Sequence, residues 1–115
     1  MIQVYHNPRC SKSRECLLFF DNSKVEFEVI HYLNDTPTTE ELKVLIKKLD
    51  IKPIELVRQK EEIWISKYKG KKMTPGQVIK AMVAHPILIE RPIVINGDKA
   101  VIARPIEKAA AIIGL

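Results

Sequence analysis

The residue with the most evident chemistry is Cys10, which stands in the segment Tyr-His-Asn-Pro-Arg-Cys-Ser-Lys-Ser-Arg of residues 5–14. This segment follows a short apolar stretch and precedes an amphipathic one, so we expect Cys10 on a loop between a first strand and a first helix. The helix N-terminus and the cations Arg9, Lys12 and Arg14 would all stabilise a thiolate. The sequence therefore predicts a Cys10 pKa below the ~8.5 of a free cysteine, and a thiol that attacks an oxyanion or a redox partner.

Cys10 does not belong to either of two common cysteine motifs. A dithiol oxidoreductase needs C-x-x-C, but Ser13 is the third residue after Cys10, and a phosphatase loop needs arginine where Cys16 stands. On one helix the two cysteines would be roughly 9 Å apart along the axis, more than the ~7 Å between Cα atoms that a disulfide tolerates. We therefore expect Cys10 to act as a single thiol or to use a thiol from elsewhere, and Cys16 to be a core residue. Two cysteines and scattered histidines make a poor zinc site, so the sequence predicts no metal.

Three arginines are candidates for binding an anion: Arg58, Arg91 and Arg104. Arg91 and Arg104 interrupt apolar segments, and each precedes a proline, Pro92 or Pro105. The planar guanidinium group suits a tetrahedral oxyanion better than the point charge of a lysine does. Each arginine taken alone is more often a member of a surface ion pair, and the two Arg-Pro dipeptides shift the balance only modestly toward an oxyanion site.

The histidines and Ser13 have supporting roles in this interpretation. His6 could either perturb Cys10 electrostatically or orient the loop through a hydrogen bond. Ser13 is predicted to cap the first helix and to donate a hydrogen bond to the Cys10 thiolate. We expect His31 and His85 to be structural.

The composition is that of one globular domain spanning residues 1–115, with 46% hydrophobic and 29% charged residues. The first residues have no signal-peptide pattern, and no apolar stretch approaches the roughly 18 residues that cross a bilayer. The sequence therefore predicts reduced thiols, a cytoplasmic location and no membrane association. The net charge of +5 owes much to Lys-Tyr-Lys-Gly-Lys-Lys at 67–72. We interpret this run as a solvated loop and expect no nucleic-acid partner, because a single interleaved aromatic residue is thin for base stacking.

Periodicity predicts an alternation of strands and helices that positions these residues. We expect strands at 2–5, 25–32, 93–95 and 100–103. We expect helices at 13–21, from a start within 36–41 to about 50, and at 53–58, 75–84 and 106–113. An apolar run at 87–89 leads into the third strand, and Asn-Gly at 96–97 predicts a hairpin. The order is strand-helix-strand, a helical middle, then strand-strand-helix. This order predicts an α/β, thioredoxin-like three-layer fold with a small mixed sheet and a helical insertion.

Four blocks of the sequence, in the same order, resemble the glutaredoxin-dependent arsenate reductases: residues 5–14, 56–58, 85–94 and 103–105. The resemblance spans nearly the whole chain. It implies that Cys10 attacks arsenate, that glutathione and glutaredoxin then supply electrons, and that arsenite leaves. It implies no bound cofactor, with glutathione as a co-substrate, and a role in arsenic detoxification.

The resemblance also implies roles for individual residues. Arg58, Arg91 and Arg104 would bind the oxyanion and stabilise the arsenic adduct. His6, Ser13 and Arg14 would belong to the loop that tunes Cys10, and Pro92 would follow a cis peptide bond in a thioredoxin-like fold. Ser11-Lys12 replaces a smaller Gly-Thr pair of many family members, which bears on how closely an oxyanion approaches the loop amides.

Two other functions remain open from the sequence. A monothiol transferase would use Cys10 alone on glutathione mixed disulfides, but it would have little use for three arginines. A thioredoxin-fold regulator that binds RNA polymerase usually carries C-x-x-C as a redox switch, and this chain lacks that motif.

Overall fold

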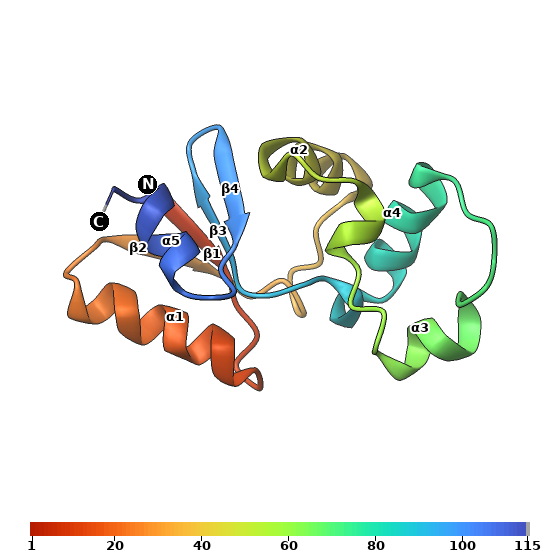
Figure 1. Ribbon diagram of the computed structural model, residues 1–115, viewed down its shortest axis with the longest axis horizontal. Helices are drawn as coiled ribbons and strands as arrows, with labels where there is room; N and C mark the ends of the chain where they lie inside the picture. The colour runs from red at the N-terminus through yellow and green to blue at the C-terminus, as the bar shows by residue number, and fades with distance from the viewer. Residues whose placement is uncertain (115) are drawn as a thin grey trace. The chain divides into compact units, whose positions relative to one another are not determined.

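The computed structural model describes residues 1–114 and divides into two compact units (Figure 1). The first unit consists of residues 1–35 together with the described residues from Arg91 onward, and the second consists of residues 36–90. A single domain spanning residues 1–115 stays a prediction, and residue 115 itself lies outside the described residues. No helix in residues 1–114 is long and apolar enough to cross a bilayer.

The first unit is built on a four-stranded mixed sheet in the order β2-β1-β3-β4. Its strands are β1 (Ile2–Tyr5), β2 (Phe27–Ile30), β3 (Ile93–Asn96) and β4 (Lys99–Ile102). Strand β1 runs parallel to β2 and antiparallel to β3, and β3 runs antiparallel to β4. The predicted hairpin joins β3 to β4, and Gly97 supplies the positive φ of 65° that such a tight turn favours.

Two helices cover one face of this sheet: α1 (Ser11–Asn22) and α5 (Glu107–Ile112) (Figure 1). Val4 pairs with Val94 in the register of β1 and β3, so both side chains point to the same face. The buried cluster on that face consists of Val4, Cys16, Phe20, Val94, Ala103 and Ala109. Cys16 and Phe20 lie one helical turn apart on α1, which confirms that Cys16 is a core residue.

The second unit is helical. It contains α2 (Thr39–Leu49), the 3-10 turn η1 (Pro53–Leu56), α3 (Glu62–Lys67), α4 (Pro75–Ala84) and a second 3-10 turn η2 (Pro86–Leu88). Helices α2 and α4 each begin with a capping box, Thr38 with Glu41 and Thr74 with Gln77, in which each side chain satisfies the other's backbone N–H. Because these caps depend on residues close together in the sequence, the starts of both helices could be predicted from it.

The α/β, thioredoxin-like class predicted from the sequence is confirmed, with a mixed sheet and the expected order of elements. Three details differ. Helix α3 was not predicted, because it is only six residues long and buries one large side chain, Trp64. The apolar run 87–89 forms the end of η2 and a single bridge between Val57 and Ile89. Helix α1 begins at Ser11, two residues before the predicted start, and this places Cys10 at its N-cap.

Candidate active site

The loop between β1 and α1 holds Cys10 at the N-terminal end of α1. The backbone N–H of Cys10 donates to the Asn7 carbonyl at 3.0 Å, and the Arg9 N–H donates to the Asn7 side-chain oxygen, also at 3.0 Å. Asn7 is 1% exposed, and these two hydrogen bonds to it stabilise the turn. Sequence reasoning missed the part played by Asn7, although its position before Pro8 is a turn signal that could have indicated it. The result is a thiol at the N-cap, where the first backbone N–H groups of the helix have no carbonyl partner within the helix.

Ser13, which belongs to α1, contacts the same loop through its side chain. Its Oγ atom accepts a hydrogen bond from the Asn7 N–H at 3.0 Å and lies 2.6 Å from Nδ1 of His6. Ser13 is fully buried, and α1 has no side-chain cap. The prediction that Ser13 caps the helix is therefore wrong, because Ser13 is the third residue of α1 and not the residue before it. Its hydroxyl ties the helix to the loop, and its backbone N–H is the group that acts on Cys10.

His6 is buried, and its imidazole contacts the hydroxyl of Ser13. Burial, the neighbouring His31 and the charge of Arg14 all lower the pKa of His6, so its neutral form is favoured near pH 7. The His6 and His31 rings meet edge to face, with centroids 6.0 Å apart. Of the two roles considered for His6, the structure supports a loop-orienting hydrogen bond, since a neutral imidazole carries no charge to act on a thiolate.

Two side chains that are distant in sequence reach the Cys10 sulfur. Arg104 donates from Nη2 to Cys10 Sγ at 3.1 Å, and its Nε donates to the Arg91 carbonyl at 2.7 Å. Arg91 is 7% exposed. Partial burial raises the pKa of the Cys10 thiol, but hydrogen bonds from the Ser13 N–H and the Arg91 side chain, then the Arg104 charge, lower it. The Lys12 N–H acts in the same direction, and the pKa of Cys10 is lowered overall.

The sequence had ascribed this low pKa to the helix N-terminus and to the charged neighbours Arg9, Lys12 and Arg14. The side chains that lower it are instead Arg91 and Arg104, and Lys12 contributes its backbone N–H. Arg14 serves the loop differently, because its Nη1 donates to the Pro8 carbonyl at 2.8 Å. The direction of the prediction and the part played by the helix N-terminus were right, and the cations were wrong.

Both Arg-Pro dipeptides of the first unit have cis peptide bonds. The bond between Arg91 and Pro92 is cis, as predicted, and Pro92 is fully buried. The bond between Arg104 and Pro105 is also cis, which the sequence analysis did not predict.

Arg58 belongs to the second unit, in which it has acidic neighbours. Its side chain lies 3.5 Å from a Glu61 carboxylate oxygen and 3.7 Å from one of Glu90, and it is 23% exposed. Its charge is therefore compensated inside that unit. The assignment of Arg58 to the oxyanion site stays a prediction.

Cys16 offers a contrast within the same helix. It is 0% exposed, and burial raises the pKa of its thiol to about 12. Both cysteines are free thiols. Among residues 1–114, no three His, Cys, Asp or Glu side chains lie together as metal ligands would. Of the two thiols, Cys10 is the one whose pKa is lowered.

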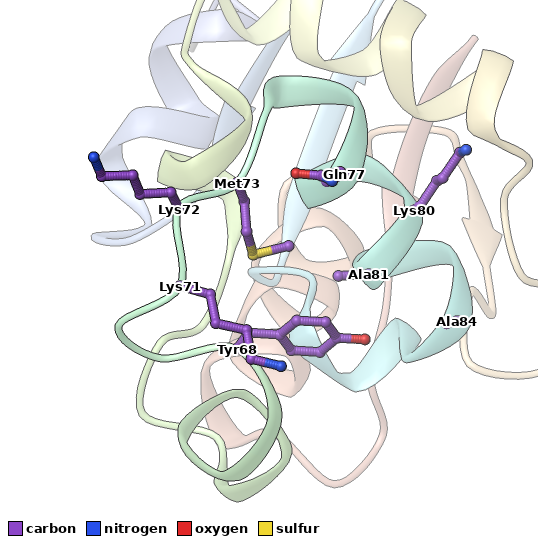
Figure 2. Close-up of a pocket in the computed structure, with 8 residues that line it drawn as sticks. All are labelled: Tyr68, Lys71, Lys72, Met73, Gln77, Lys80, Ala81 and Ala84. Atoms are coloured by element: carbon purple, nitrogen blue, oxygen red, sulfur yellow. The ribbon is translucent and has the colours of Figure 1, made fainter.

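The second unit has a pocket of its own, of about 440 Å³ (Figure 2). Tyr68 and Met73 line it together with Lys71, Lys72 and Lys80, so part of the predicted basic loop forms its wall. Figure 2 shows the side chains of Lys72 and Lys80 pointing outward, away from Tyr68. These ammonium groups do not converge, unlike the two guanidinium groups that meet at Cys10.

Known proteins resemble this chain along almost its entire length. "Arsenate reductase" of Haemophilus influenzae is 40% identical over 112 residues, which cover 96% of this chain and 97% of that protein. "Uncharacterized protein YfgD" of Escherichia coli is 41% identical over 115 residues, covering 98% and 97%. The solved structure "Arsenate reductase from Vibrio cholerae" superposes with a TM-score of 0.92 at 39% identity, covering 96% of each chain. Residues 5–112 match the ArsC family. The chain belongs to this family, that of the arsenate reductases, with their thioredoxin-like fold.

Proposed function

We propose that this protein reduces arsenate to arsenite with Cys10 as its nucleophile. The observation that carries the proposal is a single thiol with a lowered pKa, in hydrogen-bond contact with the guanidinium groups of Arg91 and Arg104. A thiolate beside two cations attracts an oxyanion and attacks its central atom. Membership of the ArsC family supports the choice of arsenate among oxyanions.

In the proposed reaction, the Cys10 thiolate forms a bond to arsenic(V) and an oxygen of arsenate leaves as water after protonation. Arg91 and Arg104 stabilise the negative charge on the remaining oxygens, and Arg58 is proposed as a third cation. Reduction to arsenic(III) takes two electrons, which two external thiols supply. A glutathione thiol replaces a second oxygen on arsenic, which leaves as water, and the glutaredoxin thiol then attacks the glutathione sulfur. The two form a mixed disulfide, and the electron pair of the broken sulfur–arsenic bond stays on arsenic. Hydrolysis of the remaining sulfur–arsenic bond then releases arsenite and returns the Cys10 thiol.

The electron donors proposed are glutathione and glutaredoxin. The chain lacks a second reactive thiol, because the only other cysteine is Cys16, which is buried with a pKa of about 12. Both thiols of the disulfide must therefore come from outside the chain. Both cysteines being free thiols fits a reducing cytoplasm, the location we propose.

A coupled assay tests this function. Arsenate-dependent oxidation of NADPH is followed with glutathione, glutathione reductase and glutaredoxin, and Cys10→Ser serves as the blank. We expect turnover that requires Cys10 and stops when glutaredoxin is withheld. If arsenate is not reduced while pH-dependent alkylation still shows a lowered Cys10 pKa, then arsenate is the wrong oxyanion. Turnover that persists in Cys10→Ser would overturn the assignment of the nucleophile.

A further inference from the structure

The pocket of the second unit, called here the basic pocket, combines apolar and cationic side chains (Figure 2). Its volume of about 440 Å³ lies within the range of ~300–1,000 Å³ that is usual for ligand sites. The apolar part of its wall consists of Tyr68, Met73, Ala81 and Ala84, and the cationic part consists of Lys71, Lys72 and Lys80. Among the described residues around it, none is acidic. The basic pocket therefore suits a ligand that is both apolar and anionic.

The lysines of the basic pocket have no anionic partner within residues 1–114. All three are exposed. Lys12 and Lys43 are different, because each of these lies within 3.6 Å of a glutamate on its own helix. An anion that reaches the basic pocket thus meets uncompensated charges and displaces no ion pair when it binds.

The directions of the ammonium groups indicate what form this anion takes. In Figure 2 the side chains of Lys72 and Lys80 leave the pocket on opposite sides. A compact anion such as phosphate cannot contact both, whereas an extended peptide advances ~3.3 Å per residue and carries carboxylates to both sides. Between the two lysines lies the apolar wall, in which Met73 supplies a flexible surface for one apolar side chain of the ligand.

Gln77 adds a polar group that suits a peptide backbone. Its side-chain oxygen accepts a hydrogen bond from the Thr74 N–H at 2.8 Å, which holds the amide at the wall of the pocket. Its NH₂ group has no hydrogen-bond partner among the described residues. This group can therefore donate to a carbonyl of a bound peptide.

A nucleic acid fits the basic pocket less well than a peptide does. Tyr68 is the only aromatic residue among the described lining residues. Its ring already contacts those of Trp64 and His85, with centroids 5.2 and 6.1 Å away. Proteins that bind single strands without sequence preference stack successive bases on several aromatic side chains.

We propose that the basic pocket binds an acidic segment of a partner protein, an extended stretch with carboxylates on both sides of one apolar side chain. The apolar side chain enters the pocket against Tyr68 and Met73. The carboxylates pair with Lys72 and Lys80 on the two sides. This assignment gives the basic run at 67–72 a binding role, and it goes beyond the reduction of arsenate.

A fluorescein-labelled peptide of about seven residues, with glutamates on both sides of a central leucine, tests the charged part of the proposal by fluorescence anisotropy. Lys72→Glu/Lys80→Glu should weaken its Kd by about tenfold or more. The matched control is Lys43→Glu/Lys60→Glu, which makes the same charge change at exposed lysines outside the pocket and should alter the Kd by less than about twofold. Absence of binding, an unchanged Kd in the Lys72/Lys80 variant or an equal loss in the control would overturn the proposal.

The apolar part is tested by changing the peptide and the pocket together. Replacing the peptide's leucine by glycine should weaken binding, and Met73→Ser should weaken binding of the leucine peptide but not of the glycine peptide. In ¹⁵N-labelled protein the leucine peptide should shift the amide signals of Tyr68, Met73 and Ala84. Signal shifts confined to other residues would place the site elsewhere and overturn the proposal.

An oligodeoxythymidylate with the same number of negative charges separates a peptide site from a nucleic-acid site. It should compete with the leucine peptide only weakly. If it competes equally well and the peptide's leucine makes no difference to the Kd, the pocket is a general polyanion site and the proposal fails. None of these measurements involves arsenate, so their outcome is independent of the proposed function.

Discussion

Cys10 and Cys16 stand six residues apart in the sequence, yet the structure gives their thiols opposite properties. Cys10 is the N-cap of α1, where backbone N–H groups and the side chains of Arg91 and Arg104 lower its pKa. Cys16 lies inside the same helix, packed on the sheet, and burial raises its pKa to about 12. The comparison shows that the difference in pKa comes from the end of the helix and from residues far away in sequence, and not from the residue type.

The largest expected effect comes from removing each thiol in turn. Cys10→Ser should abolish arsenate-dependent turnover, because a serine hydroxyl stays protonated and is a far weaker nucleophile at neutral pH. Cys16→Ser should keep most of the turnover, since its thiol has no part in the chemistry. The coupled assay measures both variants. Complete loss of turnover in a folded Cys16→Ser protein would mean that the second thiol of the reaction has been misplaced.

The next largest effect concerns the cations that distinguish the two thiols. Arg91→Ala should reduce kcat/KM for arsenate by an amount equivalent to about 3–4 kcal/mol, as expected for the loss of a donor to a developing oxyanion. Arg9→Ala is the matched control, because this exposed arginine is next to Cys10 in sequence and its side chain does not contribute to the lowered pKa. An unchanged kcat/KM in Arg91→Ala would remove Arg91 from the oxyanion site.

Arg104 allows the electrostatic part of the comparison to be tested on the thiol alone. Arg104→Ala should raise the pKa of Cys10, since an opposite charge in contact is lost. The pH dependence of alkylation by iodoacetamide reports this pKa directly. Arg104→Lys keeps the charge and loses the planar hydrogen bonds to Cys10 and to the Arg91 carbonyl, so its shift should be smaller. Equal shifts in the two variants would show that hydrogen-bond geometry, and not charge, sets the pKa.

The smallest expected effect is on stability: the two thiols should make the unfolding free energy depend on pH in opposite directions. The pKa of Cys16 is raised in the folded state, so its contribution to stability is complete below the unfolded value of ~8.5 and is lost as the pH rises above it. From pH 8 to pH 10 this loss amounts to about 1.5–2 kcal/mol of unfolding free energy. Cys10 has the opposite sign, because its lowered pKa gives stability above ~8.5 that is lost as the pH falls through the folded value.

Urea unfolding at several pH values measures this difference. In a Cys10→Ser background, adding Cys16→Ala should remove the alkaline loss of stability that is due to the buried thiol. The background variant keeps the lysines and tyrosines, so their titration is common to both proteins. If both proteins lose stability equally between pH 8 and pH 10, then Cys16 is not held protonated in the folded state.

Much of the fold could be predicted because local signals agreed with one another. The alternation in β1, the capping boxes at Thr38 and Thr74, and Asn96-Gly97 at the hairpin each depend on only a few neighbouring residues. The failures have the same origin. Helix α3 is too short for periodicity to show, and the start of α1 was expected two residues late.

The sequence by itself placed Cys10 at the start of a helix, because a turn before an amphipathic stretch is encoded in adjacent residues, and it predicted that Cys10 is a nucleophile. It also indicated that Arg91 and Arg104 were candidates, and the family resemblance assigned them a role. Only the tertiary structure decided which charges act on the sulfur. Arg104 lies 94 residues from Cys10 in the sequence and donates a hydrogen bond to its sulfur. Arg9 is next to Cys10 in the sequence, but it is not among the groups that lower the pKa of Cys10. Coulombic and hydrogen-bond interactions depend on distance in space, and the folding of β4 beside the other strands sets that distance.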